Sequence, residues 1–512
     1  MTTNRFIATA AAVLLLAASS SAQVPATRKA AAKTKTQRYV ELLAGNDVLK
    51  NSVWGILAMT QAGDTIASWN SGLRMMPASN MKLITTGAAM HRLGPDFKFE
   101  TRLAYSGTVS GGTLDGDLYI IGGGDPTIAS KDTIALTRDK LFGLWKGFLD
   151  KAGIKRINGR VIGDGRYFDG PIEDASWQYE DIGTYYGTGG DGLCFYENTQ
   201  DFRVSAGASV GSPVNVLVSF PQTPWMKYSF TGKTSKAGTG DELYLYTSDV
   251  CPFAEMRGTF AIDRSAKMEE FANKYGAYTC AHYFCEYLAS AGVPVTQGPA
   301  DVRGGRIRSD LTVLTPGPYA AKVDDLTVVG RTYSPTLKQI VRETNHRSDN
   351  FYAETAFRTL GRRMHHSACA DSSLLALTEV LRSLGVDPSG VNLKDGSGLS
   401  RKNYVSPEYF VRFLTAMMDS PVFEEYVGTL PQPGRGTLAS RLRGEKESVK
   451  SRIYMKSGSM DGVLCYSGYI VPSEGSKADA IVFSLLTNNV IAPTRDLTPI
   501  IDRILASLAA EN

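Results

Sequence analysis

The chain has 512 residues, of which 43% are hydrophobic and 21% charged, and its formal net charge is +4 at pH 7. That length corresponds to about three domains of ordinary size, with enough apolar residues to build full cores without disulfides or metals as supports. A charge so close to balance indicates no nucleic-acid partner.

The first 22 residues have the pattern of a secretory signal peptide. Arg5 supplies a positive charge, Phe6 to Ala18 form a mostly apolar run, and Ser20-Ser21-Ala22 offers small residues for cleavage. The apolar run is shorter than the ~20 residues that span a bilayer, and no cysteine is placed to take a lipid. We therefore expect an exported protein of the periplasm or cell envelope, with no transmembrane segment.

Residues 23–38 form a basic leader that is rich in Ala and Thr. Its positive charges are those of Arg28, Lys29, Lys33, Lys35 and Arg38. We interpret this stretch as a solvated leader, with attraction to an anionic envelope surface as the alternative.

Two β-rich runs, 53–59 and 65–69, are separated by turn residues and predict a hairpin. A helix is predicted from Ser79 to Leu93, where Gly94-Pro95 ends it. From 102 to 305 the chain becomes rich in glycine and short strands, which predicts an insertion of one or two smaller domains.

Within the insertion, Gly207-x-Ser209-x-Gly211 matches the nucleophile elbow of α/β-hydrolases. An elbow needs a strand before it and a helix after it, whereas Pro213 and the β-rich run 214–220 follow here. We therefore interpret this segment as a loop.

Six cysteines in an exported chain permit disulfides. Cys280 and Cys285 lie in a helical-looking run, where five residues rise ~7.5 Å, too far for a bridge between them. Cys465 is expected to be a buried free thiol in a strand. A disulfide between Cys194 and Cys251 is possible, but the sequence does not decide whether it forms.

After the insertion, a helix is predicted with Ser334 as its cap and Pro335 in its first turn, and a second helical run covers 351–360. Further strands and a final helix are predicted at residues 452–460, 463–471, 480–487 and 497–508. Residues 39–101 and 306–512 together predict one split catalytic domain, an α/β sandwich of an antiparallel sheet with helices.

Three short motifs occur in a fixed order, and they are Ser79-Asn80-Met81-Lys82, Ser348-Asp349-Asn350 and Lys456-Ser457-Gly458. Their forms, S-x-x-K, S-x-N and K-[ST]-G, are the active-site signature of serine enzymes that acylate themselves on D-alanyl-D-alanine peptides or β-lactams. A chain of this length contains about two S-x-x-K matches by chance. The prediction therefore depends on the order of the motifs and on their contexts: a helix after a hairpin, a loop between helices, and a strand before a turn.

The spacing of the first motif suits nucleophilic chemistry. Ser79 and Lys82 share one face of a helix, with Ser79 near its N-terminal end. A serine hydroxyl is a poor nucleophile until a base takes its proton. Lys82 can be that base if burial and a second cation, Lys456, lower its pKa. On the strand, Gly458 would let the substrate backbone approach.

In these motifs and beyond them, the chain resembles the low-molecular-mass class C penicillin-binding proteins, which are D-alanyl-D-alanine carboxypeptidases and endopeptidases of the bacterial envelope. The segment 119–127 resembles the glycine-rich part of that family's insertion, and 395–401 and 430–438 resemble parts of its catalytic domain. The long stretch between S-x-x-K and S-x-N is typical of the family. Ser457 stands where the family usually has Thr, and it keeps the hydroxyl.

The resemblance implies a serine β-lactamase/DD-peptidase-like sandwich with a large β-rich insertion. It also implies an acyl-enzyme formed with peptidoglycan stem peptides, or with β-lactams as covalent inhibitors, and no metal or cofactor. The catalytic residues that it implies are Ser79, Lys82, Ser348, Asn350 and Lys456. The substrate-binding residues that it implies are Ser457, Gly458, Ser459, Met460 and Asp181. The backbone N–H groups of Ser79 and Ser459 would form the oxyanion hole.

Asp181 follows Trp177 in a W-x-x-x-D stretch that resembles part of the family's insertion near the cleft. A carboxylate there suits the ammonium at the end of a diaminoacid side chain in the stem peptide. Asp174 is the second candidate, and Met460 would supply an apolar wall. The alternative is that Asp181 is a solvated loop residue.

Two other functions use similar motifs. A serine β-lactamase needs a further feature that speeds hydrolysis of the acyl-enzyme; Tyr196-Glu197-Asn198 superficially resembles one lactamase motif, but Ser348-Asp349-Asn350 already occupies that position. A non-catalytic envelope binding protein would have a degenerate site, whereas all three motifs are intact here.

Overall fold

The computed structural model describes residues 32–302, 325–474 and 479–511. The expected signal peptide and most of the basic leader lie outside these ranges. Helix α1 (Lys35–Leu42) is capped by Thr34, so the last residues assigned to the leader belong to the folded chain. None of the helices in the described ranges combines the length and apolarity needed to cross a bilayer.

A five-stranded antiparallel sheet joins the two ends of the chain in the order β18-β19-β20-β1-β2. Its strands are β1 (Val53–Met59), β2 (Thr65–Trp69), β18 (Ile453–Met460), β19 (Val463–Ile470) and β20 (Ile481–Asn488). β20 pairs with β1 along its whole length, from Val53 opposite Asn488 to Met59 opposite Val482. The predicted antiparallel sheet of an α/β sandwich is confirmed.

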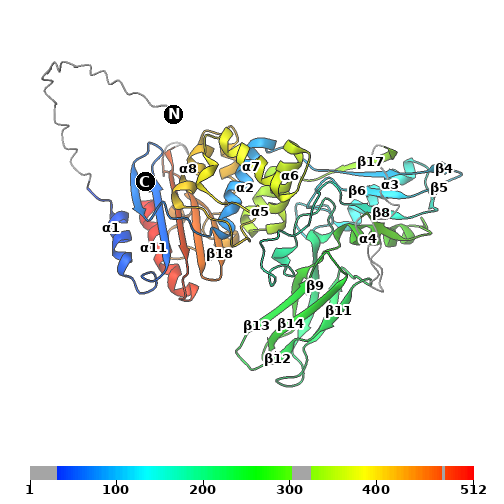
Figure 1. Cartoon of the computed structure of the whole chain (residues 1–512), viewed down its shortest axis with the longest axis horizontal. Helices are drawn as coiled ribbons and strands as arrows, with labels where there is room; N and C mark the ends of the chain where they lie inside the picture. Colours follow the sequence, from blue (N-terminus) through cyan, green and yellow to red (C-terminus); the bar gives the residue numbers. More distant parts are fainter. Residues whose placement is uncertain (1–31, 303–324, 475–478, 512) are drawn as a thin grey trace, which may run out of the picture. The chain divides into compact units, whose positions relative to one another are not determined.

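Helices cover both faces of this sheet, and every residue of β19 and β20 is buried. On β20, Val482 and Leu486 enter a hydrophobic cluster with α2 and α5 to α8, whereas Phe483 and Leu485 enter a second cluster with α1 and α11. This alternation follows from the two-residue period of a strand. Figure 1 shows α1 and α11 on one side of the sheet and the larger helical group on the other.

The helices of this sandwich, besides α1, are α2 (Met81–Leu93), α5 (Leu337–Arg347), α6 (Asn350–His365), α7 (Ala370–Ser383), α8 (Pro407–Met418), α9 (Phe423–Val427), α10 (Glu447–Lys450) and α11 (Thr494–Ala510). The predicted cap of α5 was wrong. Thr336 caps the helix and forms a capping box with Gln339, and Pro335 lies before the helix. The Ser334 hydroxyl instead accepts a hydrogen bond from the Phe99 N–H.

The first part of the inserted region is a mixed sheet in the order β16-β8-β6-β3-β17, with α3 and α4 in its hydrophobic cluster. Its elements are β3 (Glu100–Tyr105), β6 (Leu118–Ile121), β8 (Val161–Asp164), β16 (Pro299–Asp301), β17 (Thr327–Tyr333), α3 (Arg138–Lys151) and α4 (Gly276–Ser290). A small sheet lies beside it, formed by β4 (Thr108–Ser110), β5 (Thr113–Asp115) and β7 (Arg156–Ile157). Because β17 pairs with β3, the strand at 327–333 joins this sheet although it lies beyond residue 306. The domain division stays a prediction.

The second part, which we call the β-lobe, consists of two sheets. One contains β9 (Thr199–Ser205), β10 (Asn215–Phe220) and β15 (Lys267–Ala272), and the other contains β11 (Lys227–Phe230), β12 (Lys233–Ser235), β13 (Asp241–Thr247) and β14 (Phe253–Ala261). Phe202 of the first sheet packs in one cluster with Met256 and Phe260 of the second. Ser209 lies between β9 and β10 with no helix after it, so the predicted loop at 207–211 is confirmed.

All six cysteines lie in the described ranges, and all six are free thiols. Cys465 is buried in β19, as predicted. Cys194 is buried and Cys251 is exposed, so the bond between them that the sequence left open is not formed. The fold therefore depends on its hydrophobic clusters and its hydrogen bonds, without covalent bridges.

Candidate active site

The nucleophile segment begins as a single 3₁₀ turn, Ala78–Asn80, which leads directly into α2. Ser79 is in this turn, and Lys82 lies one turn further, fully buried. The Lys82 ammonium donates to Ser79 Oγ at 2.9 Å, to Asn350 Oδ1 at 2.6 Å and to the Ser397 carbonyl at 2.7 Å. The Asn350 and Ser397 oxygens thus hold this nitrogen against the Ser79 hydroxyl that it would deprotonate.

Burial lowers the pKa of Lys82 to about 8, while the carboxylates of Asp395, Asp349 and Glu354 oppose this shift. A base is most effective when its pKa lies near the working pH. Lys456 was predicted to be a second cause of this shift. Burial is instead the cause that lowers the pKa of Lys82, and the repulsion between the two lysines lowers the pKa of Lys456.

The S-x-N motif occupies the junction between two helices. Ser348 ends α5 in a left-handed conformation with φ of 60°, Asp349 caps α6, and Asn350 is the first residue of α6. The predicted loop between helices therefore contains only two residues. The Lys456 ammonium donates to Ser348 Oγ at 2.9 Å and to the Ser457 carbonyl at 2.7 Å. Burial, together with the Lys82 charge, lowers the pKa of Lys456 well below its ordinary value.

Strand β18 forms the border of the site, and it packs directly on the nucleophile turn. A Cβ added at Gly458 would lie 2.9 Å from the Ser79 nitrogen and 2.8 Å from the Asn80 nitrogen. Glycine is therefore required at this position for the strand to pack on the turn. The reason predicted from the sequence was different, namely that Gly458 lets the substrate backbone approach. Next to it, the Ser457 hydroxyl donates to Thr437 Oγ1 at 3.0 Å.

These elements surround a cavity of about 510 Å³. The predicted site residues that line it are Ser79, Asp181, Ser348, Asn350, Ser459 and Met460. Lys82 and Lys456 are fully buried in the wall behind it. Of the two other predicted binding residues, Ser457 reaches the cavity through Thr437, which lines it, and Gly458 contacts the nucleophile turn.

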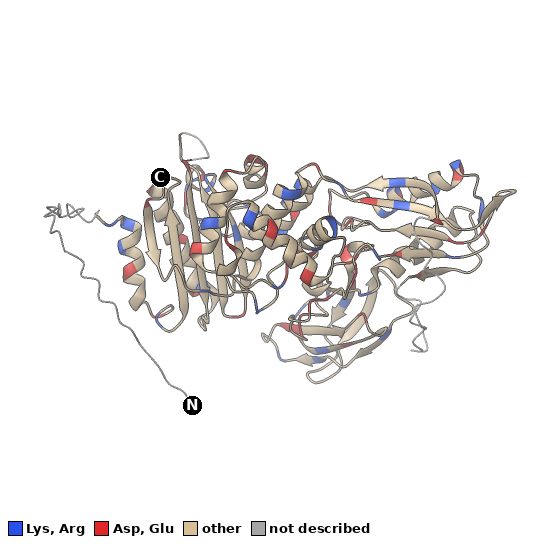
Figure 2. Cartoon of the chain, turned by 45° about the horizontal axis from the view of Figure 1, so that its top comes forward, with Lys and Arg blue, Asp and Glu red and all other residues tan. Residues whose placement is uncertain are grey.

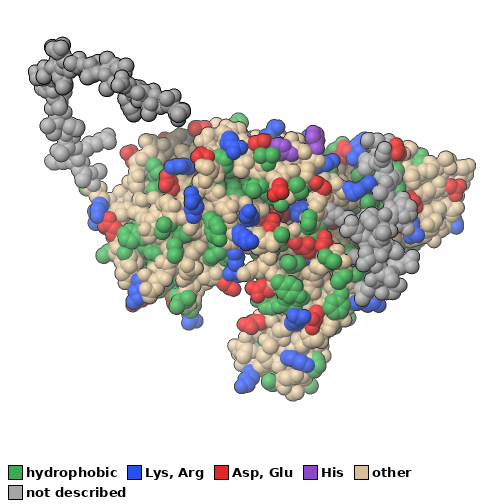
Figure 3. Space-filling model, viewed as in Figure 1, with side chains coloured by type: hydrophobic (Ala, Val, Ile, Leu, Met, Phe, Trp, Pro, Cys, Tyr) green, Lys and Arg blue, Asp and Glu red, His purple; other side chains and the backbone are tan. Residues whose placement is uncertain are grey.

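The inserted region gives this cavity an acidic and aromatic wall. Charges of both signs are mixed over the described elements as a whole (Figure 2). The cavity, in contrast, is lined on the insertion's side by Glu180, Asp181, Tyr185, Tyr186, Glu197, Tyr244 and Glu270. On the face drawn in Figure 3, acidic, basic and hydrophobic side chains lie close together at the base of the β-lobe. A wall of this kind suits a cationic group of a ligand.

Asp181 is buried and lies in this wall, and Met460 lines the same cavity. Burial raises the pKa of its carboxyl, and the Tyr186 hydroxyl, which donates to Oδ1 at 3.2 Å, opposes that shift. Asp174 does not line the cavity. The geometry therefore favours Asp181 as the acidic candidate, and the role of either residue stays a prediction.

Several residues of the site were not proposed from the sequence. Ser397, Asp395 and Thr437 lie in the two segments that carry the family resemblance, so a signal for them existed. Asp395 accepts hydrogen bonds from the Gly398 and Ser400 N–H groups, from Asn403 and from Trp177 Nε1 at 2.8 Å. Trp177 belongs to the inserted region, so Asp395 links that region to the segment that orients Lys82.

A comparison with protein families identifies the chain. The model of the D-Ala-D-Ala carboxypeptidase 3 (S13) family matches residues 36–510. The chain belongs to this family. The expected relationship to the low-molecular-mass class C penicillin-binding proteins is thereby confirmed, and the activity is that of a serine-type D-alanyl-D-alanine carboxypeptidase.

Individual relatives agree with this assignment over most of their length. The D-alanyl-D-alanine carboxypeptidase of Actinomadura sp. (strain R39) is 27% identical over 462 residues, which is 88% of this chain and 81% of the relative. The D-alanyl-D-alanine carboxypeptidase DacB of Haemophilus influenzae is 26% identical over 432 residues, which is 82% of each chain. The crystal structure of penicillin binding protein 4 (dacB) from Haemophilus influenzae has the same fold, with a TM-score of 0.74 at 22% identity over 93% of this chain and 98% of that one.

Proposed function

We propose that Ser79 is the nucleophile that attacks the carbonyl of the penultimate D-alanine in a peptidoglycan stem peptide, with Lys82 as its general base. The contact that carries this proposal is the 2.9 Å hydrogen bond between Lys82 Nζ and Ser79 Oγ, at the wall of a cavity that also contains the S-x-N motif. Lys82 takes the hydroxyl proton as the bond from Ser79 Oγ to the carbonyl carbon forms. Asn350 keeps the amine of Lys82 in place and orients the substrate amide.

The leaving group requires a proton when the peptide C–N bond breaks. Ser348 supplies it to the leaving nitrogen, and the proton held by Lys82 replaces it. The backbone N–H groups of Ser79 and Ser459 stabilise the oxyanion, and the loss of one such donor costs about 10²–10³ in rate. Water then attacks the ester carbonyl as Lys82 takes one of its protons. The bond from the carbonyl carbon to Ser79 Oγ breaks, and Lys82 gives that proton to Ser79 Oγ.

The terminal carboxylate of the substrate is recognised by Lys456, Ser457 and Thr437. Lys456 is too deeply buried to line the cavity, whereas Thr437 lines it and accepts a hydrogen bond from Ser457. The hydroxyl groups therefore make the direct contact, and Lys456 supplies the positive charge from behind. A bound carboxylate stabilises the charged form of Lys456, which in turn favours the neutral, basic form of Lys82.

We also propose that the protein is exported, that it cleaves cross-linked stem peptides and that β-lactams inhibit it. The apolar run after Arg5 supports export to the periplasm or cell envelope. An enzyme that transfers a D-alanyl carbonyl to water acts as a carboxypeptidase on a free terminus and as an endopeptidase on a cross-link. A β-lactam presents a strained amide to Ser79 in the same position.

Mass spectrometry after incubation with benzylpenicillin tests this function. We expect one adduct with the mass of the intact drug, on the peptide that contains Ser79, and none on the Ser79→Ala variant. Ser209→Ala serves as the control, because Ser209 belongs to the G-x-S-x-G segment in the β-lobe loop. An adduct on another residue, or none on the wild type, would exclude the proposal, and an adduct lost within seconds would favour a β-lactamase.

A further inference from the structure

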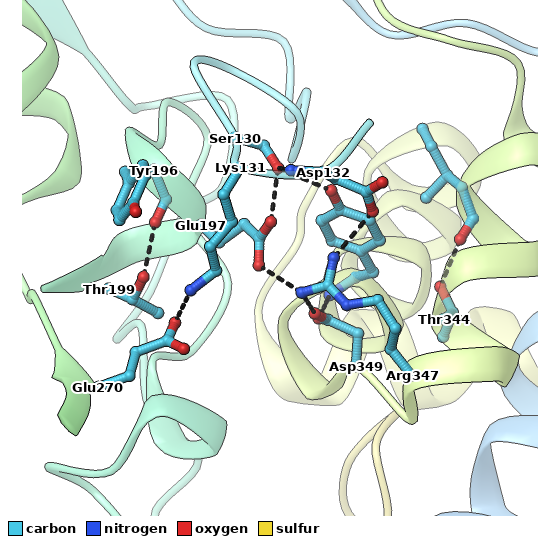
Figure 4. A network of polar contacts seen from close by, with 12 residues as sticks. Ser130, Lys131, Asp132, Tyr196, Glu197, Thr199, Glu270, Thr344, Arg347 and Asp349 are labelled. Carbon is cyan, nitrogen blue, oxygen red and sulfur yellow. Dashed lines mark hydrogen bonds and ion pairs between the residues drawn. The ribbon is translucent and has the colours of Figure 1, made fainter. Parts of the chain in front are cut away.

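Arg347, which immediately precedes the S-x-N motif, is surrounded by three carboxylates (Figure 4). Its guanidinium lies 2.9 Å from Asp132 Oδ2, 3.0 Å from Glu197 Oε2 and 3.5 Å from Asp349 Oδ2. Asp132 and Glu197 come from the inserted region, and their side chains are only 3% exposed. The cluster therefore joins the inserted region to the motif through one arginine.

The backbone is strained on both sides of this cluster. Ser348 has φ of 60°, and Tyr196, Glu197 and Asn198 have φ of 55°, 58° and 55° in succession. Side-chain-bearing residues rarely adopt this left-handed conformation, and they keep it only where the surroundings hold them there. Glu197 forms an ion pair with Arg347, the residue before Ser348. This contact therefore holds the two strained segments against each other.

A third strained segment joins the same cluster. Ala129 has φ of 49°, and the next residue, Ser130, donates from its hydroxyl to Glu197 Oε1 and accepts from the Asp132 N–H. Ser130 Oγ also lies 3.3 Å from the Tyr352 hydroxyl of α6. Ser130 thus holds the carboxylate of Glu197 and the backbone of Asp132, and Asp132 Oδ1 also accepts from the Ile134 N–H at 3.3 Å.

The side chains of Ser348 and Asn350, the first and last residues of the S-x-N motif, depend on the position of this junction. Ser348 Oγ accepts the hydrogen bond from Lys456, and Asn350 Oδ1 accepts the one from Lys82. Asn350 Nδ2 in turn donates to the Tyr186 carbonyl of the inserted region at 2.9 Å. The Ser348 and Asp349 N–H groups both donate to the Thr344 carbonyl of α5, so Ser348 ends that helix as a left-handed cap. The Arg347 ion pairs add contacts from the inserted region to this junction.

We propose that Arg347, Glu197 and Asp132 are positioning residues for the acylation reaction. Their ion cluster fixes the α5–α6 junction against the inserted region, which keeps the Ser348 hydroxyl on Lys456 and in line with the leaving nitrogen. The inserted region therefore takes part in catalysis through this cluster, in addition to shaping the cavity. The inference rests on the proposed function, since it assigns these residues to the step in which Ser348 transfers the proton.

A matched control separates positioning from simple attachment of the inserted region. Arg358 of α6 also binds that region, because its guanidinium donates to the Pro171 and Ile172 carbonyls at 2.8 and 2.9 Å. Arg358 lies more than two helical turns from the motif and does not line the cavity. Arg358→Met should therefore weaken the attachment without displacing Ser348.

The test measures the acylation rate at saturating benzylpenicillin, the dissociation constant of the non-covalent complex and the Tm of each variant. We expect Arg347→Met to lower the saturating rate about 100-fold while the dissociation constant changes less than about threefold, because misplaced groups affect chemistry more than binding. Arg347→Lys should recover about tenfold of that loss, since a lysine replaces the charge but not the two-pronged geometry. Arg358→Met should keep a rate within about threefold of wild type even if its Tm falls.

Glu197→Gln provides a second route if Arg347→Met does not fold. It keeps the shape of the side chain and removes its charge, and we expect the saturating rate to fall about tenfold. The proposal is overturned if a folded Arg347→Met or Glu197→Gln variant acylates at the wild-type rate. It is also overturned if Arg358→Met loses as much rate as Arg347→Met. A wild-type protein that fails to acylate would instead count against the proposed function.

Discussion

At the scale of single residues, two lysines decide how the site works. Lys82 and Lys456 are both fully buried, and burial lowers the pKa of each. Their partners differ, because Lys82 contacts the nucleophile and Asn350 whereas Lys456 contacts Ser348 and its own strand. The proposed mechanism therefore gives the two residues different steps, and the effects of their substitutions should be distinguishable.

Lys82→Ala and Lys456→Ala should each impair acylation by benzylpenicillin, for different reasons. The first removes the base, which typically contributes about 10²–10⁴ in rate. The second removes the charge behind the carboxylate site and the partner of Ser348. Stopped-flow acylation should therefore show a lower saturating rate for Lys82→Ala and, in addition, weaker binding for Lys456→Ala. Both variants should remain folded by circular dichroism, and a wild-type rate in either would contradict the role given to that lysine.

The pH dependence of acylation follows from the pKa of about 8 at Lys82. Only the neutral amine can accept the Ser79 proton, so the second-order rate constant should rise about tenfold per pH unit from pH 6 and level off above about pH 8. A rate that is flat from pH 6 to 9 would contradict this assignment.

Glu354→Gln is the control for this profile, because burial also raises the pKa of Glu354 to about 8. Glu354 Oε1 accepts from the Gly396 and Ser397 N–H groups, and glutamine retains that acceptor. A carboxylate near Lys82 raises its pKa, so the inflection should persist in this variant at the same or a lower pH. Its disappearance would assign the inflection to Glu354.

Asp181 should govern the choice between substrates rather than the chemistry. A stem peptide with a free side-chain ammonium should be hydrolysed faster than its N-acetylated form, because a charge-assisted contact in a partly buried wall discriminates between them. Asp181→Ala should abolish this preference and leave penicillin acylation within about threefold of wild type. Asp174→Ala is the matched control, and an unchanged preference in Asp181→Ala would exclude the residue.

At the scale of elements, the site depends on how closely β18 packs on the nucleophile turn. Gly458 faces the backbone of that turn, and a Cβ added there would lie 2.7 to 2.9 Å from Pro77 O, Ser79 N and Asn80 N. Overpacking of this kind costs about 1–3 kcal/mol. The junction thus places the strand motif and the nucleophile within reach of one substrate.

Gly458→Ala should lower both the stability and the acylation rate. We expect a loss of about 1–3 kcal/mol in urea unfolding, together with a slower reaction at Ser79 because the strand must move away from the turn. Gly444→Ala is the control, since a Cβ there has nothing within 4 Å and its φ is not positive. Equal effects of the two substitutions would show that the close approach of β18 is unimportant.

At the scale of the whole molecule, the inserted region and the catalytic sandwich form one site. Three contacts join them, and they are Trp177 with Asp395, Tyr186 with Asn350, and Glu197 with Arg347. These contacts are polar and involve buried groups, so they are specific in direction as well as in distance. Deletion of the inserted region would therefore expose unpaired polar groups beside Ser79, in addition to removing part of the cavity wall.

Reductant should leave the folded molecule unchanged, because all six cysteines are free thiols. The Tm measured by differential scanning calorimetry should be the same with and without dithiothreitol. Alkylation of the unreduced, denatured protein should label all six cysteines. A lower Tm in reductant, with only four cysteines labelled, would indicate a disulfide and contradict the structure.

Local sequence patterns were enough to predict the family, the three motifs, the hairpin at 53–69 and the strands of the C-terminal part. The motifs and elements among these features are local, since a helix face needs only the spacing of Ser79 and Lys82, and a buried strand needs only a short apolar run bounded by turn residues. The cap of α5 shows the limit of local reasoning. Ser334 and Thr336 are both suitable caps, and the Phe99 N–H engages the first of them.

Contacts between residues far apart in the chain could not be predicted in this way. The Ser397 carbonyl accepts a hydrogen bond from Lys82, and the Asn80 backbone packs on Gly458. Asp132 and Glu197 form ion pairs with Arg347. In each case the partners lie far apart in the chain. No periodicity or spacing encodes these contacts, because they depend on how complete sheets and helices pack against one another. Burial also sets the pKa of Lys82, and burial is a property of the packed molecule rather than of any segment.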